Sequence, residues 1–243
     1  MYAFTLERPA TVQDAAKLAA NGSKPLAGGQ TLLASMKLRL SSPDKLADLS
    51  GIKDMSSIKR DGNSIVIGAM ARHADVAVNA EVMAAIPALA HLAGNIGDRQ
   101  VRAMGTMGGS VANNDPSACY PSAVLALGAT IHTTARKIEA KDYFQGMFTT
   151  ALNDGELITA ISFPIPKRAA YMKFKQQASR FAKGLGQLGF AHARLAFKQQ
   201  WALQFKCQKH CGCQPTMSKI PGFLQRSRQS INGCKKHHLL LIQ

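Results

Sequence analysis

The chain has 243 residues, of which 46% are hydrophobic, and its 30 Lys and Arg residues exceed its 14 Asp and Glu residues to give a net charge of +16. This length suits one large domain or two to three small ones, and the apolar fraction is ordinary for a globular protein. No apolar run is long enough for a membrane-spanning helix, and no basic start precedes an apolar core. We therefore expect no membrane span and no signal peptide, and we take the cytoplasm as the compartment.

The positive charge is concentrated at the C-terminus. Residues 183–243 hold ten Lys and Arg residues and no acidic residue, whereas residues 1–182 hold 20 basic and 14 acidic residues. A basic segment can bind phosphate backbones, so a nucleic-acid-binding protein is one interpretation. The chain has one Trp and four Tyr residues, and it lacks the interleaved aromatic side chains on which bases stack. We therefore expect no nucleic-acid partner.

Apolar periodicity and turn residues predict a series of short elements. A capping box at 11–14 and an Asn21-Gly22 stop bound the first helix. The other expected elements are strands over 3–7 and 24–27, a helix over 31–40, strands over 45–49, 57–59 and 64–68, helices over 72–79 and 81–94 with a new turn at Pro87, a helix over 120–127, and strands over 130–134, 156–163 and 171–174. Residues 95–118 are rich in Gly and Asn and show little periodicity, so we expect a functional segment without regular structure.

Two double-glycine segments carry the strongest chemical signal. Ala27–Thr31 and Thr106–Ser110 each end in a hydroxyl residue, and each follows basic residues, Lys24 before the first and Arg99 and Arg102 before the second. Paired glycines let the backbone approach a ligand closely, and successive free N–H groups in such a turn bind anions. The first segment also has the order strand, glycine turn, helix of a phosphate cradle. Two such turns predict a ligand with two phosphates, a dinucleotide, and two ordinary tight turns are the alternative.

No catalytic constellation accompanies these loops, since there is neither a Ser-His-Asp pattern nor an HExxH motif. We interpret Met104 and Met107 as packing residues. The two arginines before the second loop are either solvated surface charges or lie near a pyrophosphate or a subunit interface. The histidines of the first 182 residues are interpreted as structural, namely His73, His91 and His132.

The segments around the glycine loops resemble the flavin-binding medium subunit of the molybdenum hydroxylases, a family that includes aerobic carbon monoxide dehydrogenase and xanthine dehydrogenase. The resemblance covers residues 1–182 and rests on Arg8-Pro9, Lys24–Thr31, Gly97–Ser110, Asn113–Pro116 with Tyr120-Pro121, Phe174–Gln176 and Ala178–Arg180. It implies an α+β fold of the vanillyl-alcohol-oxidase (PCMH) type, in which FAD lies between two α+β subdomains. On this basis we expect a first FAD-binding subdomain over 1–55, a second over 56–175, and a degenerate C-terminal segment over 176–243 in which the family's C-terminal subdomain is truncated or replaced.

The resemblance also implies which residues contact FAD. A family aspartate near the adenosine end falls here on Cys119, with Asp115 close by, so both are candidates. No catalytic residue and no metal ligand is expected. The cofactor-binding candidates are Lys24, Pro25, Leu26, Ala27, Gly28, Gly29, Gln30, Thr31, Ile96, Thr106, Gly108, Gly109, Ser110, Asp115, Cys119, Ile158 and Lys175.

The function implied is electron relay, in which the cofactor carries the chemistry and the protein supplies binding and position. The family's partners are a molybdopterin-containing large subunit and a small subunit with [2Fe–2S] centres, and the electron acceptor is NAD or a quinone. A non-functional truncated flavoprotein remnant and a basic nucleic-acid-binding protein are the alternatives. Flavin absorbance of the purified chain distinguishes the first function from both.

The resemblance stops after Ala182. The continuation has no acidic residue and no sustained period, which indicates translation in a shifted reading frame from about residue 183, and a divergent basic tail is the alternative. Its cysteines could be taken for a zinc site, but their spacing is not that of a standard finger or ribbon, so we expect no metal there. These residues are Cys207, Cys211, Cys213 and Cys234, with His210.

A frameshifted tail should be removed by protease without loss of the body. Its apolar residues lack the period that would give it a face to bury, so we expect trypsin to trim the chain to a stable fragment ending near Arg180 or Lys183. Limited proteolysis followed by mass spectrometry measures this. A tail that resists trypsin as well as residues 1–182 do would contradict the frameshift interpretation.

Overall fold

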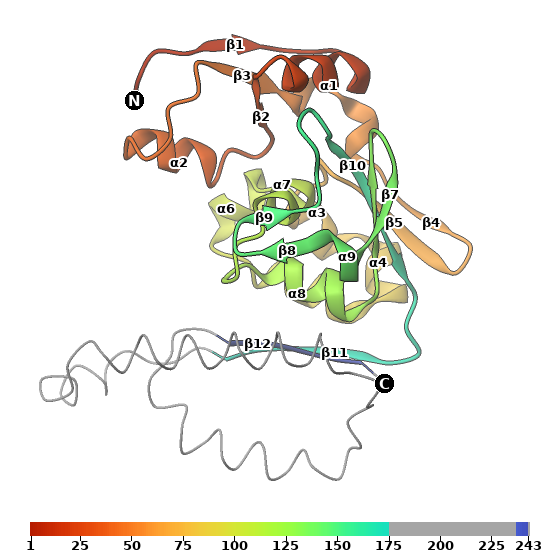
Figure 1. Ribbon diagram of the computed structural model, residues 1–243. Coiled ribbons are helices and arrows are strands. Elements are labelled where there is room, and N and C mark those ends of the chain that lie inside the picture. The colour runs from red at the N-terminus through yellow and green to blue at the C-terminus, as the bar shows by residue number, and fades with distance from the viewer. Residues whose placement is uncertain (175–236, 243) are drawn as a thin grey trace, which may run out of the picture. The chain divides into compact units, whose positions relative to one another are not determined.

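The computed structural model describes residues 1–174 and 237–242 (Figure 1). The N-terminal part of the chain is built around a small sheet of three parallel strands in the order β1-β3-β2. In this sheet Leu46 of β3 pairs with both Leu6 and Lys24. Its elements are β1 (Thr5–Glu7), α1 (Val12–Ala20), β2 (Lys24–Leu26), α2 (Leu32–Lys37), β3 (Lys45–Asp48) and the 3-10 turns η1 (Leu49–Gly51) and η2 (Lys53–Ser56).

The ends of the first two helices follow from local chemistry. The Thr11 hydroxyl accepts the Asp14 N–H at 3.1 Å and starts α1, and Gly22, with a φ of +87°, follows its end. The helix α2 is shorter than predicted and ends at Lys37. Beyond it, Arg39 takes a left-handed φ of +59°, which a helix cannot continue through, and Leu40 is 78% exposed.

The second sheet has five antiparallel strands in the order β4-β5-β10-β6-β7. Its strands are β4 (Ile58–Asp61), β5 (Ser64–Gly68), β6 (Thr130–Thr133), β7 (Lys137–Glu139) and β10 (Ile158–Pro164). The other elements are α3 (His73–Val78), α4 (Ala80–Ala85), α5 (Pro87–Gly94), α6 (Arg99–Met104), α7 (Met107–Asn113), α8 (Cys119–Ala126), α9 (Ala140–Tyr143), β8 (Phe144–Gly146), β9 (Thr149–Thr150), β11 (Ala169–Phe174) and β12 (His237–Ile242), and the last two pair with each other.

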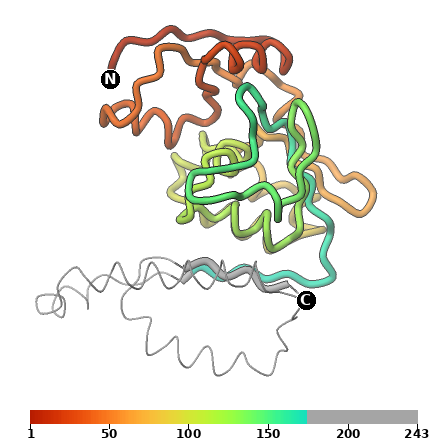
Figure 2. The backbone as a smooth tube through the Cα atoms, in the orientation of Figure 1, coloured from red at the N-terminus to blue at the C-terminus, as the bar shows by residue number. Residues whose placement is uncertain are grey.

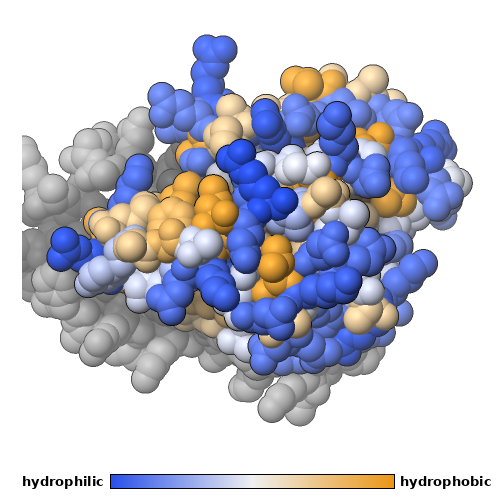
Figure 3. Space-filling model, turned by 90° about the horizontal axis from the view of Figure 1, so that it is seen from above, coloured by the Kyte–Doolittle hydropathy of each residue, from blue (hydrophilic) through white to orange (hydrophobic). Residues whose placement is uncertain are grey.

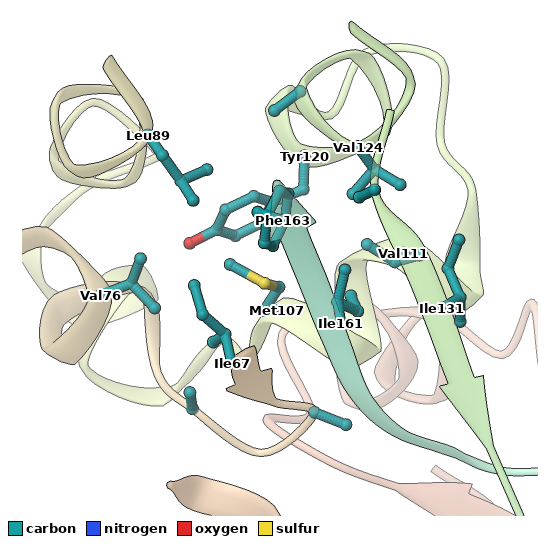
Figure 4. Close-up of a cluster of buried hydrophobic side chains, with 14 of the residues drawn as sticks. Ile67, Val76, Leu89, Met107, Val111, Tyr120, Val124, Ile131, Ile161 and Phe163 are labelled. Atoms are coloured by element: carbon teal, nitrogen blue, oxygen red, sulfur yellow. The ribbon is translucent and has the colours of Figure 1, made fainter. Parts of the chain in front are cut away.

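The core lies where the helices pack on this five-stranded sheet (Figure 4). Alternate residues of the strands point toward the helices, as expected for a sheet with one buried face. From the sheet come Ile67, Ile131, Ile161 and Phe163, and from the helices Val76, Leu89, Met107, Val111, Tyr120 and Val124, all of them fully buried. Met107 and Val111 belong to α7, the helix whose first turn contains the second glycine pair, so that helix is fixed to the sheet by its apolar face.

The α+β class is confirmed, with a parallel and an antiparallel sheet each accompanied by helices. The expectation for residues 95–118 is wrong, because α6 and α7 lie there. Each has an N-cap, since the Asp98 carboxylate accepts the Val101 N–H at 2.8 Å and the Thr106 hydroxyl accepts the Gly109 N–H at 3.2 Å. Residues Met1–Met172 belong to one compact unit, which is not divided further. The predicted boundary between subdomains 1–55 and 56–175 therefore stays a prediction.

Several predictions fall outside the described residues. They concern Lys175, the segment 176–236 with its shift of reading frame and its cysteines, and the family motif at 178–180. Within residues 1–174 and 237–242, none of the helices has the length and apolar character needed to cross a bilayer.

Candidate functional site

The first glycine loop, Ala27–Thr31, leaves the end of β2 and enters α2. Within the described part of the chain, the backbone N–H groups of Gly28, Gly29, Gln30 and Thr31 donate to no protein acceptor. Gly29 has a φ of +69°, which turns successive N–H groups toward one side. Thr31 starts α2 without a side-chain cap, and its hydroxyl makes no hydrogen bond to the described residues, so it can donate to a ligand. The free N–H groups are those that the sequence led us to expect here, and anion binding by this loop stays a prediction.

The second glycine segment, Thr106–Ser110, is built differently, because Thr106 is the N-cap of α7 and Met107–Ser110 belong to the first turn of that helix rather than to a loop. Its N–H groups are already used, since Met107 donates to the Ala71 carbonyl at 3.0 Å, Gly108 to the Ala69 carbonyl at 2.8 Å and Gly109 to the Thr106 hydroxyl. The expectation of free N–H groups in this turn is therefore wrong. The segment 69–73 runs beside it and accepts two of these three N–H groups.

The same segment explains the glycine at position 108. A Cβ there would lie 2.5 Å from the Cβ and 2.8 Å from the carbonyl oxygen of Ala69, so only glycine lets α7 pack this closely on the end of β5. Side-chain hydroxyls remain on this loop. The Thr106 hydroxyl accepts one hydrogen bond and can still donate, with the residue 3% exposed, and the hydroxyl of the half-buried Ser110 has no hydrogen-bond partner among the residues the structure describes.

The two glycine loops meet each other (Figure 2). A Cβ at Gly28 would overlap the carbonyl oxygen of Met104 and lie 2.8 Å from the Cα of Gly105. A Cβ at Gly109 would lie 3.4 Å from the Cβ of Ala27. Since these contacts join residues about eighty positions apart, the first loop is seated on the turn between α6 and α7. Gly28 is required by this backbone contact, a reason that the sequence did not provide.

The remaining candidates are spread over the larger sheet and its helices. Ile158 is 6% exposed in β10 and lies beside a β-bulge. The half-buried Asp115 follows α7, and its carboxylate accepts the N–H and the hydroxyl of Ser117, each at 2.8 Å. Cys119 is only 4% exposed, and its thiol accepts the Tyr171 hydroxyl at 3.5 Å within the core. Lys24 is exposed on the edge strand β2.

His73 was interpreted as structural, and its surroundings agree. Its backbone N–H donates to the Gly105 carbonyl at 3.0 Å, and its ring is 5% exposed, with its centroid 5.2 Å from that of Tyr120. Burial, helped by the nearby Arg102 charge, lowers the pKa of His73 to about 4. Burial also raises the pKa of Tyr120, so both side chains are neutral at pH 7. Two uncharged rings therefore lie behind the turn on which the first loop is seated.

The donor set fits a phosphate-bearing cofactor and does not fit a metal centre. Among the described residues, no three or more His, Cys, Asp and Glu side chains come together as possible metal ligands. The first loop, in contrast, offers a run of free N–H groups, the Thr31 hydroxyl and the nearby Lys24. Ser110 and Thr106 add hydroxyls from the adjoining loop. This arrangement indicates an α+β protein of the class that binds a phosphate-bearing ligand.

Comparison with known proteins identifies the family. Residues 2–166 match the family described as the FAD binding domain in molybdopterin dehydrogenase. The chain therefore belongs to this family, and FAD is its cofactor.

The chain is 38% identical over 189 residues to the carbon monoxide dehydrogenase medium chain of Afipia carboxidovorans. It is 37% identical over 187 residues to the glyceraldehyde dehydrogenase medium chain of Sulfolobus acidocaldarius. Each match covers 74% of this chain and 66% of the relative.

Solved structures agree with the sequence matches. Reconstituted carbon monoxide dehydrogenase from Oligotropha carboxidovorans superposes with a TM-score of 0.70 at 37% identity, over 73% of this chain and 66% of that one. Quinoline 2-oxidoreductase from Pseudomonas putida 86 gives a TM-score of 0.70 at 29% identity, over 72% and 64%. The PCMH-type fold is thereby confirmed. The chain spans just under two thirds of the length of the relatives that it matches.

Proposed function

We propose that this chain is the FAD-binding subunit of a molybdenum hydroxylase, and that it passes electrons from the [2Fe–2S] centres of a small subunit to an external acceptor. The observation that carries the proposal is the seating of the first glycine loop on the turn before the second, with the N–H groups of Gly28–Thr31 free. Family membership and the medium-chain relatives support the same role. Neither the remnant nor the nucleic-acid alternative is favoured.

The residues of the chain would bind and position the cofactor. The backbone of Gly28–Thr31 would donate to the pyrophosphate, and Thr31, Thr106 and Ser110 would add hydroxyl donors. Lys24 would contribute positive charge at the edge of β2. FAD, when bound, supplies a carrier that exchanges electrons singly or in pairs, which suits a subunit between one-electron iron–sulfur centres and a two-electron acceptor.

The assignment of the other contacts rests on the family resemblance. Pro25, Leu26 and Ala27 would line the approach to the first loop. Gly108 and Gly109 would act through packing, because their N–H groups are bonded within the protein. Contacts from the rest of the chain would come from Ile96, Asp115, Cys119, Ile158 and Lys175.

The partners proposed are a molybdopterin-containing large subunit and a [2Fe–2S] small subunit, with NAD or a quinone as acceptor and the cytoplasm as the compartment. The names of the relatives support a multi-subunit enzyme, since they include medium chains and a subunit of a dehydrogenase complex. The face seen in Figure 3, on the side of β1 and α1, carries exposed hydrophobic side chains. Exposed apolar side chains of the first 40 residues are Met1, Tyr2, Phe4, Leu6, Leu38 and Leu40, a set that an assembled complex could cover.

The purified chain should bind one FAD without a covalent bond and should not hydroxylate substrate by itself. Its described residues include one free cysteine, the buried Cys119, whereas a [2Fe–2S] centre needs four ligands. The measurements are the flavin absorbance after gel filtration, FAD release on acid precipitation, and turnover with a dye acceptor. A chain that retains no flavin after incubation with FAD would overturn the proposal, and so would substrate hydroxylation by the isolated polypeptide.

A further inference from the structure

We propose that Arg102 is a positioning residue of the flavin site, which holds α6 in place so that the turn after it receives the first glycine loop. The proposal rests on the proposed FAD-binding function. It assigns Arg102 neither to the solvated surface nor to the pyrophosphate. Its evidence is the hydrogen bonding at the two ends of α6.

At the start of α6, Arg102 closes the turn that precedes the helix. Its Nη1 donates to the carbonyl oxygens of Ile96 and Gly97, each at 3.0 Å. Gly97 has a φ of +52°, and a Cβ there would lie 2.9 Å from the Cβ of Val101, so the turn can approach the helix only at a glycine. The hydrogen bond from the Val101 N–H to the Asp98 carboxylate is a third contact that fixes this turn to α6. Ile96, a predicted flavin contact, is therefore oriented through the guanidinium.

At the end of α6, the backbone reaches the first glycine loop. The Gly105 N–H donates to the Val101 carbonyl at 2.7 Å, and the Gly105 carbonyl accepts the His73 N–H at 3.0 Å. This leaves the Met104 carbonyl directed at Gly28, where a Cβ would overlap it. A six-residue helix spans only about 9 Å, so a tilt at its first turn moves its last carbonyl. Arg102 thus connects the position of Ile96 with the seat of the first loop.

The geometry gives Arg102 a structural role that needs no phosphate. Its Nη1 donates to two carbonyl oxygens of the protein and the residue is half-buried, while Nε and Nη2 donate to no described residue, so the salt dependence of FAD binding decides whether they reach an anion. Arg99 provides a matched comparison on the same helix. It carries the same charge, is exposed, and makes no hydrogen bond or ion pair through its side chain within residues 1–174. A purely electrostatic role would make the two arginines equivalent, whereas a positioning role makes only Arg102 important.

The test compares R102M, R102K and R99M in the full chain, with the dissociation constant for FAD measured by flavin fluorescence quenching at low and high salt. We expect R102M to bind FAD about 10- to 100-fold more weakly, because two charge-assisted hydrogen bonds are lost. Its salt dependence should equal that of the wild type, since no phosphate contact is removed. R99M should change the constant by less than about twofold.

The visible circular dichroism of the bound flavin provides a readout that a loss of stability alone would not move. At saturating FAD, R102M should give an altered band, because Ile96 and the first loop are displaced, and R99M should keep the wild-type band. R102K keeps the charge on a shorter side chain that cannot reach both carbonyls, so we expect binding between that of R102M and the wild type. If R102M does not fold, R102K is the test of the proposal. An R102K protein with the FAD affinity and the flavin dichroism of the wild type would overturn it.

Other outcomes would overturn the proposal as well. Equal losses in R102M and R99M, or a loss in R102M that disappears at high salt, would assign Arg102 to long-range electrostatics. Wild-type protein that binds no FAD would instead overturn the proposed function itself, so the two failures are distinguishable.

Discussion

Replacement of Gly28 by Val should abolish tight FAD binding and lower the free energy of unfolding. Any Cβ at this position overlaps the Met104 carbonyl and lies within 2.9 Å of two further backbone atoms of the facing turn. Backbone atoms cannot rotate away as a side chain can, so the two loops must separate. Overpacking of this kind costs about 1–3 kcal/mol. The same displacement disturbs the donors of Gly28–Thr31, and we expect FAD affinity to fall about 30- to 100-fold, or beyond detection.

The matched control for Gly28 is Gly94, on the exposed side of α5. A Cβ there comes no closer than 3.8 Å to any atom, so G94A should bind FAD normally and should be stabilised by a few tenths of a kcal/mol. G28A should already show the defect, because the overlap involves the Cβ alone. Equilibrium unfolding in urea and FAD titration measure both effects. Normal FAD binding by G28A would show that the contact with Met104 is not needed to hold the loop.

The sequence predicted the glycine loops but not the reasons for their glycines. Spacing and flanking residues predicted that Ala27–Thr31 and Thr106–Ser110 serve one ligand, and the structure brings the two segments together. The pattern does not reveal that the N–H groups of Met107 and Gly108 are bonded to the segment 69–73, because that segment lies some forty residues earlier. In the sequence, a glycine that is needed for close approach of a ligand cannot be told from a glycine that is needed for close approach of another backbone segment. Only the fold distinguishes them.

The regular structure was predicted best where apolar periodicity was strong. The strand pair around Asp61-Gly62 and the helices from His73 to Gly94 were found close to their observed bounds. The helices α6 and α7 were missed because each is short and glycine or methionine interrupts its pattern. Their N-caps, Asp98 and Thr106, were the available signal. The short elements over 137–150 were not predicted, since strands of two or three residues are too short to show an alternating apolar pattern.

The network around Arg102 lay outside what the sequence could supply. Two roles were considered for this arginine, surface charge and anion contact, and the structure gives it a third, the closure of a turn through two carbonyl oxygens. Such a role requires knowing that Ile96 and Gly97 turn back toward the helix. It also places a cation near a buried histidine, which has a consequence for the response of the protein to acid.

The stability of the protein should fall as the pH is lowered from about 6.5 to 4, and His73 should account for about 3 kcal/mol of that fall. In the folded chain, burial first and the charge of Arg102 second lower the pKa of His73 from its ordinary 6.5 to about 4. Above pH 6.5 the imidazole is neutral in both the folded and the unfolded chain, so the stability is fully present. Between pH 6.5 and about pH 4, His73 is protonated in the unfolded chain and neutral in the folded chain, so the free energy of unfolding falls as the pH is lowered. Below pH 4 both states are protonated and this loss ends.

The variant H73F separates this effect from the other titrations. Phe keeps a ring beside Tyr120 without a proton to bind, and the backbone bond to Gly105 is unaffected. The His73 Nδ1 has no hydrogen-bond partner among the described residues, so its loss should change stability little at pH 7.5. Asp48 and Glu156, whose pKa values are lowered by hydrogen bonds and ion pairs that outweigh burial, titrate alike in both proteins and cancel in the difference. Urea unfolding at pH 7.5 and 4.5 should show H73F nearly equal to the wild type at the first pH and about 2–3 kcal/mol more stable at the second. The exposed His91 serves as the control, because H91F should lose stability in acid as the wild type does. An H73F protein that loses as much stability as the wild type between pH 7.5 and 4.5 would show that His73 is not buried in its neutral form.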